Sequence, residues 1–308
     1  MIELDSVSKR FGNTPVVDRV SFAVERGEFC ALVGPSGAGK STLLRLVNRL
    51  IEASAGTIRI DGTTIARQSA VELRRRIGYV IQSVGLFPHW TVADNIATVP
   101  RLLRWPEARI EARIDELLDL VRLDGAAIRD QYPRQLSGGQ QQRVGVARAL
   151  AADPDLLLMD EPFGALDPIT RQALRVELAR IHRATGKTIL FVTHDIDEAL
   201  MLADKIAVMQ GGTLAQFGTP QAILAQPANS FIRDFFGGTG LGLKLLAQRR
   251  VADHVQRGAV AEGEPIAAEA PLTEALSAMI LRQSDRLPVR DRDGKIIGAI
   301  VLGDLVGR

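Results

Sequence analysis

The chain has 308 residues, of which 46% are hydrophobic and 24% are charged, with a formal net charge of +2. This length accommodates one large domain and a small one, and the near-neutral balance argues against nucleic acid as a partner. No stretch reaches the roughly 18 to 20 apolar residues of a membrane span, and no signal peptide is visible, so we expect a cytoplasmic protein that meets a membrane only through partners. The single cysteine, Cys30, cannot form an internal disulfide and is expected to lie buried on a strand.

The predicted elements alternate between strands and helices along most of the chain. Short apolar runs in residues 2–33 predict antiparallel strands. Further strands are predicted at 29–33, 56–60, 77–81, 155–159, 188–193, 205–209 and 213–217. Helices are predicted from Lys40, over 107–123 and 138–151, from Pro168 to a stop at Gly186, and over 195–203. This alternation indicates an α/β fold with a mostly parallel sheet core, an antiparallel β subdomain and a helical insertion at 91–123.

A change in composition near the end of the chain predicts a second domain. The glycine-rich stretch at 237–242 predicts a flexible linker over 237–249, between a large domain at 1–236 and a small α+β domain at 250–308. The small domain is expected to contain a helix with Thr273 as a candidate cap, and a hairpin formed by 287–289, the turn 293–294 and 296–301.

The loop between the predicted strand at 29–33 and the helix from Lys40 has the sequence of a phosphate-binding P-loop. It reads Gly34-Pro35-Ser36-Gly37-Ala38-Gly39-Lys40-Ser41-Thr42. The backbone N–H groups of such a loop and the helix N-terminus form a nest for phosphates. Lys40 adds a positive charge for the β- and γ-phosphates, and the hydroxyl of Ser41 is suited to Mg²⁺. A plain glycine-rich turn would not need these residue types together.

Two acidic residues, Asp160 and Glu161, follow the continuous apolar run at 155–159. Neighbouring like charges at a buried strand end are unfavourable unless a cation compensates them. We therefore expect Asp160 to hold Mg²⁺ through its water shell. Glu161 is placed to polarise an attacking water as a general base.

A second glycine-rich helix start, Leu136-Ser137-Gly138-Gly139-Gln140, has no role in an ordinary P-loop enzyme. The pair of motifs is similar to that of the ATP-binding cassette (ABC) ATPases. The resemblance implies ATP as the nucleotide and a homodimer that sandwiches two ATP molecules head to tail. In such a dimer Ser137, Gly138, Gly139 and Gln140 act in trans, because the helix that they start directs its N–H groups at the γ-phosphate held by the other subunit.

The same resemblance implies roles for four further residues. Gln82 matches the Q-loop glutamine that senses Mg²⁺ and water, and His194 matches the switch histidine that contacts the γ-phosphate. Phe11 matches the aromatic residue that stacks on adenine, and Asp167 matches the D-loop at the dimer interface. Simpler explanations exist: a satisfied histidine at a strand end for His194, a core residue for Phe11 and a helix N-cap for Asp167.

Four longer stretches resemble the importer ATPases of the quaternary-amine subgroup, which serve glycine betaine, choline, carnitine or proline betaine. They are 78–90, 95–100, 140–148 and 161–171. The resemblance implies a membrane permease and an extracytoplasmic substrate-binding protein as partners, and a location at the cytoplasmic face of the membrane. Another solute, such as an amino acid, a polyamine or an anion, is the alternative. A soluble cassette acting on nucleic acid would carry tandem cassettes, a coiled coil or a basic arm, and none is visible.

Two features beyond the nucleotide motifs also bear on partners. The apolar residues Leu86, Phe87, Pro88 and Trp90 are candidates to receive a coupling helix of the permease, with packing inside the helical insertion as an equal alternative. The pattern of residues 271–304 is similar to a CBS module. Val301 stands where the adenosine-binding form of that module has Ser or Thr, so we expect a dimerising or regulatory role for this domain.

Overall fold

The computed structural model describes residues 1–82, 85–164 and 166–306. Ser83, Val84 and Ala165, which belong to the stretches compared above, lie outside the described residues. The chain divides into two compact units, Met1–Thr219 (unit 1) and Pro220–Arg308 (unit 2), and each is described by itself. The domain limits expected at 236 and 250 stay a prediction.

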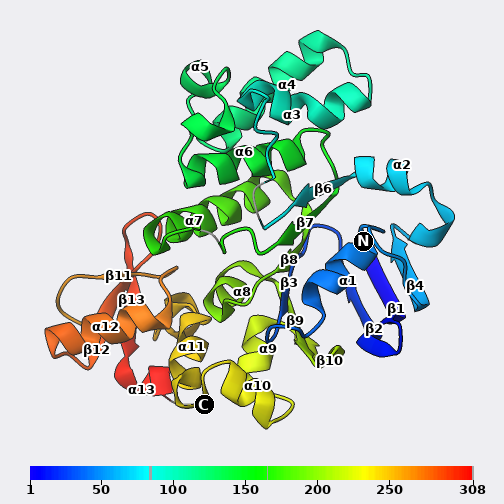
Figure 1. Cartoon of the computed structure of the whole chain (residues 1–308). Helices are drawn as coiled ribbons and strands as arrows, with labels where there is room; N and C mark the ends of the chain where they lie inside the picture. The colour runs from blue at the N-terminus through cyan, green and yellow to red at the C-terminus, as the bar shows by residue number, and fades with distance from the viewer. Residues whose placement is uncertain (83–84, 165, 307–308) are drawn as a thin grey trace. The chain divides into compact units, whose positions relative to one another are not determined.

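Unit 1 is built around a six-stranded sheet with the order β10-β9-β3-β8-β7-β6 (Figure 1). Its strands are β3 (Phe29–Val33), β6 (Ile77–Val80), β7 (Leu156–Asp160), β8 (Thr188–Val192), β9 (Lys205–Gln210) and β10 (Thr213–Gly218). All pairs are parallel except β9 with β10. Every residue of β3, β7 and β8 is buried, as expected for strands covered on both faces. The predicted parallel core is therefore confirmed.

A second, antiparallel sheet of unit 1 has the order β2-β1-β4-β5. Its strands are β1 (Ile2–Phe11), β2 (Thr14–Val24), β4 (Ala55–Ile60) and β5 (Thr63–Thr64). The predicted antiparallel strands are confirmed, and β1 and β2 are long because they pair over their whole lengths despite register shifts between Leu4 and Arg10. Such bulges bend a strand without ending it.

The helices of unit 1 include the predicted insertion, which Figure 1 shows gathered at the β6 side of the large sheet. Its α-helices are α1 (Lys40–Val47), α2 (Ala70–Arg75), α3 (Val92–Leu102), α4 (Glu107–Leu120), α5 (Gly125–Ile128), α6 (Gly138–Leu150), α7 (Pro168–Thr185) and α8 (Ile196–Leu202). Two 3₁₀ turns lie at Ile65–Arg67 and Pro133–Gln135. Helix α7 begins after its N-cap Asp167 and ends at Gly186 in the left-handed conformation, as predicted.

Unit 2 is a small α+β unit with one three-stranded sheet. The order β11-β12-β13 joins Ile266–Ala267, Arg286–Arg290 and Ile296–Val301, and the expected hairpin is the antiparallel pair of β12 and β13. Its helices are α9 (Pro220–Ala225), α10 (Ser230–Phe235), α11 (Leu241–Ala247), α12 (Leu272–Arg282) and α13 (Leu302–Val306), with 3₁₀ turns at Gly238–Gly240 and Val251–His254. The likeness to a CBS module stays a prediction.

Two local predictions for unit 2 differ from the structure. Residues 237–249 contain a 3₁₀ turn and helix α11 where we expected a flexible linker, because the leucines of α11 recur at helical spacing and Leu246 packs against the core of unit 2. Thr273 is not a cap: α12 begins after Pro271, with no side-chain cap, and buried Leu272 anchors its first turn. Among the described residues, no helix combines the length and the apolar character needed to cross a membrane.

Candidate nucleotide site

The P-loop brings backbone and charge together at the end of β3. Helix α1 begins after Gly39 without a side-chain cap, so its first N–H groups remain available to a ligand. Gly39 has φ 93°, and a Cβ there would lie 2.5 Å from the carbonyl oxygen of Val16, so a glycine is required. The ammonium Nζ of Lys40 donates to the carbonyl oxygens of Gly34 at 2.6 Å and Pro35 at 2.9 Å.

A cavity of about 260 Å³ lies over this loop, lined by Val16, residues 36–42 and Glu161. Its lining fits phosphates, because it combines an uncapped helix start with the Lys40 ammonium and contains one acidic residue. Burial lowers the pKa of Lys40 below its usual value, while the charges of Glu161 and Asp160 act in the opposite direction. A bound phosphate would favour the charged ammonium further.

The acidic residues after β7 occupy different positions. Asp160 is 7% exposed, and its Oδ1 accepts a hydrogen bond from Ser41 Oγ at 2.8 Å. No cluster of three metal-ligating side chains occurs among the described residues. One carboxylate and one hydroxyl beside a phosphate nest nevertheless fit Mg²⁺, which keeps several waters and takes ligands from substrate phosphates. The structure therefore brings together Ser41 and Asp160, two of the three residues expected at the metal, and the third, Gln82, contacts Glu161.

Glu161 contacts the two other residues that were predicted to act with it in hydrolysis, Gln82 and His194. Its Oε2 accepts a hydrogen bond from Gln82 Nε2 at 3.1 Å and lies 3.2 Å from Nδ1 of His194. Its backbone N–H donates to the Val192 carbonyl oxygen at 2.9 Å, and its φ of 45° lies in the left-handed region that side chains other than glycine rarely adopt. Strained backbone of this kind is concentrated at functional sites.

The simpler explanation of a satisfied histidine at a strand end stays open for His194, which follows β8, is 58% exposed and places its Nδ1 3.2 Å from Glu161 Oε2. Exposure rejects the simpler explanation for Phe11. This residue is 51% exposed and its ring lies 5.0 Å from the Lys9 ammonium, so it is not a core residue. The ring is free to stack on another flat group, although its role toward adenine stays a prediction.

The second glycine-rich motif is a capped helix start. Ser137 Oγ accepts from the Gln140 N–H at 3.3 Å and Gln140 Oε1 accepts from the Ser137 N–H at 2.8 Å, which together form a capping box. A Cβ on Gly139 would lie 2.7 Å from Thr170 Cγ2 at the start of α7. None of Ser137, Gly138, Gly139 or Gln140 lines the cavity over the P-loop. The motif therefore lies outside the P-loop cavity of its own chain.

Asp167 caps α7 by accepting from the N–H groups of Ile169 and Thr170 at 3.1 and 3.0 Å. The N-cap explanation is therefore confirmed for this residue. Thr170, whose N–H donates to Asp167, also lies next to Gly139, since a Cβ added there would be 2.7 Å from Thr170 Cγ2. The two predicted interface segments therefore lie side by side. The cap is thus compatible with the predicted place of Asp167 at a dimer interface.

Comparison with known proteins decides the family. Residues 17–164 match the family model described as "ABC transporter". The glycine betaine uptake system ATP-binding protein YehX of Escherichia coli (strain K12) is 54% identical over 306 residues, which cover 99% of each chain. This chain belongs to the ABC transporter ATPases. It is a member of their glycine betaine/choline/carnitine osmoprotectant uptake family.

Two further matches support this ABC ATPase assignment. The glycine betaine/carnitine/choline transport ATP-binding protein OpuCA of Bacillus subtilis (strain 168) is 47% identical over 301 residues, covering 97% of this chain and 78% of OpuCA. The dimeric structure of a post-hydrolysis state of the ATP-binding cassette MJ0796, bound to ADP and Pi, matches with a TM-score of 0.63 and 32% identity over 71% of this chain and 99% of that chain. The predicted family and ATP binding are confirmed.

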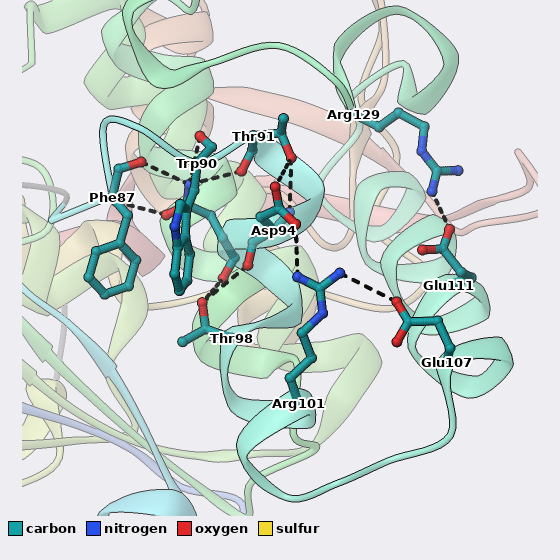
Figure 2. Close-up of polar contacts among 10 residues, drawn as sticks. Phe87, Trp90, Thr91, Asp94, Thr98, Arg101, Glu107, Glu111 and Arg129 are labelled. Atoms are coloured by element: carbon teal, nitrogen blue, oxygen red, sulfur yellow. Dashed lines mark hydrogen bonds and ion pairs between the residues drawn. The ribbon is translucent and has the colours of Figure 1, made fainter.

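The loop that follows Gln82 in this ABC ATPase presents aromatic side chains. The rings of Phe87 and Trp90 lie 4.6 Å apart, and Phe87 is 40% exposed (Figure 2). Fully buried Asn95 fixes this loop, since its Oδ1 accepts from the Phe87 N–H at 2.8 Å and its Nδ2 donates to the Thr91 carbonyl oxygen at 2.9 Å. An ion pair of Asp94 with Arg101 at 2.8 Å braces the same helix. The aromatic pair thus packs internally and still keeps an exposed face.

Sequence reasoning missed two contributors to the site. Val16 lines the cavity from β2, and nothing in its sequence context marks it, because its position depends on how the two sheets meet. Asn95 belongs to none of the nucleotide motifs, so its part in fixing the aromatic loop was not predicted. In the structure Asn95 lies in the first turn of α3, where a side-chain amide can bind the backbone of the loop before the helix, but no helix start was predicted there from the sequence.

Proposed function

We propose that this ABC ATPase hydrolyses Mg²⁺-bound ATP through Glu161 and thereby energises import of a quaternary ammonium osmoprotectant. The observation that carries the hydrolytic assignment is the single oxygen of Glu161 that contacts both Gln82 and His194 at the edge of the P-loop cavity. The names of YehX and OpuCA, which match this chain over nearly its full length, support the class of solute.

In this mechanism the P-loop binds and orients the phosphates. The α1 amides and the Lys40 ammonium hold the phosphate oxygens, and Phe11 stacks on adenine. Mg²⁺, held by Ser41 and through water by Asp160, would neutralise charge that develops on the phosphates. Glu161 accepts a proton from the attacking water, and Gln82 and His194 fix the direction of its carboxylate.

A second copy of the chain completes each site. The capping box occupies the N–H groups of Ser137 and Gln140 within their own chain. The N–H groups of Gly138 and Gly139 and the helix dipole are left to act on the γ-phosphate held by the partner. Hydrolysis would remove that phosphate and release the clamp between the two subunits.

The remaining partners follow from this role. A permease would receive the ATPase at the cytoplasmic face of the membrane, with the exposed face of the Phe87 and Trp90 pair as a docking surface. An extracytoplasmic binding protein would deliver the solute, and an aromatic cage suits a quaternary ammonium group. Unit 2 would act in pairing or regulation.

Uptake of radiolabelled solutes by cells that carry the full transporter tests both parts of the proposal. Glycine betaine or choline should accumulate with the wild-type chain, and Glu161→Gln should lower uptake and ATP turnover by about 10²–10⁴-fold while ATP still binds. The exposed residue Glu262 supplies the control Glu262→Gln, which should behave as wild type. Uptake of an amino acid, polyamine or anion instead would contradict the solute class, and unchanged turnover in Glu161→Gln would contradict the base.

A further inference from the structure

A buried polar network surrounds the predicted switch residue His194. Thr193 is 2% exposed and Glu198 is 4% exposed, and the side chain of Arg175 is 12% exposed. Thr193 and Asp195 are the direct neighbours of His194, Glu198 lies in the first turn of α8, and Arg175 lies on α7. The exposed histidine is therefore held between two residues that belong to one buried network.

The hydroxyl of Thr193 lies at the centre of this network. It donates to Glu198 Oε2 at 2.5 Å and accepts from the Asp195 N–H at 3.0 Å. The Thr193 backbone N–H donates to the Leu32 carbonyl oxygen at 3.2 Å, next to the P-loop strand end. The residues before and after His194 are thus fixed, because the Asp195 N–H donates a hydrogen bond to the Thr193 hydroxyl.

Arg175 connects the same loop to α7. Its guanidinium donates to Glu198 Oε1 at 2.8 Å and to Asp195 Oδ2 at 2.5 Å. Burial by itself would lower the pKa of Arg175, but the hydrogen bonds and charges of Glu198 and Asp195 raise it above its usual value. The network therefore holds a permanently charged cation against two acceptors. It spans from α7, which begins at the cap residue Asp167, to the loop that carries His194.

The chemistry of the network indicates a geometric role. Moving a cation and a carboxylate out of water is costly, and well-packed apolar residues often stabilise a fold at least as well as a buried ion pair does. A buried network in which each group has a defined acceptor fixes direction as well as position. The direction that matters here is that of the His194 imidazole, whose Nδ1 lies 3.2 Å from Glu161 Oε2.

We propose that Thr193, Glu198 and Arg175 are positioning residues that hold the His194 loop in register with Glu161 and with helix α7. This inference rests on the proposed role of His194 in hydrolysis. The three residues do not touch the nucleotide cavity, so they act only through the histidine. Loss of the Thr193 hydroxyl frees the Asp195 N–H and one Glu198 oxygen, and the His194 loop then samples positions away from Glu161.

The chain supplies a matched control at the other end of the same strand. Thr188 begins β8, is fully buried, and accepts a hydrogen bond from the Gly27 N–H at 2.9 Å. Thr193→Val and Thr188→Val remove the same group from comparable burial without changing side-chain shape. A merely structural hydroxyl should therefore give the same result at both positions.

ATP hydrolysis by the full chain, measured as kcat and KM together with thermal unfolding, decides the question. Thr193→Val should lower kcat by about tenfold with KM for ATP unchanged, as expected when the two hydrogen bonds that position the His194 loop are lost while His194 itself remains. Thr193→Ser should restore most of kcat, and Thr188→Val should keep kcat whatever it does to Tm. Equal kcat in the two valine variants, or a serine variant as slow as the valine variant, would overturn the inference.

One further variant separates this inference from the proposal on which it rests. His194→Ala should lower kcat at least as far as Thr193→Val does. If His194→Ala is inactive while Thr193→Val keeps wild-type kcat, the role of His194 stands and the positioning network fails. If His194→Ala hydrolyses ATP as wild type does, the role of His194 fails and the positioning inference fails with it.

Discussion

Both units place an acidic residue shortly after a strand, and its surroundings differ between them. In unit 1, Glu161 follows β7, has a left-handed backbone and lines the cavity beside the Lys40 ammonium. In unit 2, Asp304 follows β13, and its carboxylate accepts from Gln256 Nε2 at 3.1 Å at both oxygens and from the Val301 N–H at 3.2 Å. The first carboxylate contacts two side chains, Gln82 and His194, that we propose act with it in hydrolysis, and the second closes a local turn.

We therefore expect nucleotide chemistry in unit 1 and not in unit 2. The Val301 N–H and the Gln256 amide already satisfy Asp304, so an adenosine would have to displace partners of the same chain. The P-loop offers the opposite situation, since α1 has no side-chain cap. Unit 2 is therefore expected to change ATP hydrolysis only indirectly.

The largest effect expected from this contrast is the loss of ATP binding in Lys40→Ala. This substitution removes the ammonium that we expect to hold the phosphate oxygens, so the Kd for ATP should rise by about 10²-fold or more. Isothermal titration of the full chain with ATP measures it. Lys295→Ala, which removes an exposed lysine of unit 2, should keep the wild-type Kd. A loss of affinity in the unit 2 variant would break the contrast.

A smaller effect on ATP binding, close to none, is expected for damage inside unit 2. Leu287 is 1% exposed in the core of that unit, and Leu287→Ala should destabilise it by about 2–5 kcal/mol. The Kd for ATP should stay that of wild type. Leu158→Ala in fully buried β7 is the counterpart, and it should lower both the free energy of unfolding and the affinity for ATP. Calorimetric unfolding and titration on the same samples compare the two variants, and parallel losses of ATP affinity would show that the units are not independent.

Local sequence patterns predicted the elements that carry the site. Continuous apolar runs predicted the buried strands β3 and β7, and Asp167, Pro168 and Gly186 marked both ends of α7. Local patterns did not predict the start of a helix correctly where packing against a neighbouring element determines it. Packing of Leu272 starts α12 earlier than the hydroxyl of Thr273 suggested.

The motifs of the site could be named from the sequence, but their arrangement could not. Gln82, Glu161 and His194 lie in loops after three different strands, and only the strand order brings them to one carboxylate oxygen. The contact of Arg175 with Glu198 joins helices α7 and α8 through two residues that are 23 positions apart in sequence, so no local pattern indicates it. Long-range packing therefore supplies what residue spacing does not.

We propose that the P-loop is half of a site and that the helix starting at Gly138 completes the site of a second copy. Gly138→Asp tests this directly. A Cβ at Gly138 would lie 3.6 Å from Leu166 Cδ2, an ordinary contact, and a carboxylate in the first turn favours its own helix. The same carboxylate would repel the γ-phosphate of the partner. Gly125→Asp places the same change at the first position of α5 and is the matched control.

The measurement is the ATP-dependent change in mass of the Glu161→Gln chain by light scattering. We expect Glu161→Gln to gain the mass of a dimer when ATP is added, and the Gly125→Asp derivative to do the same. The Gly138→Asp derivative should bind ATP with the same stoichiometry and show no ATP-dependent gain in mass. An equal gain in mass with Gly138→Asp would contradict the account.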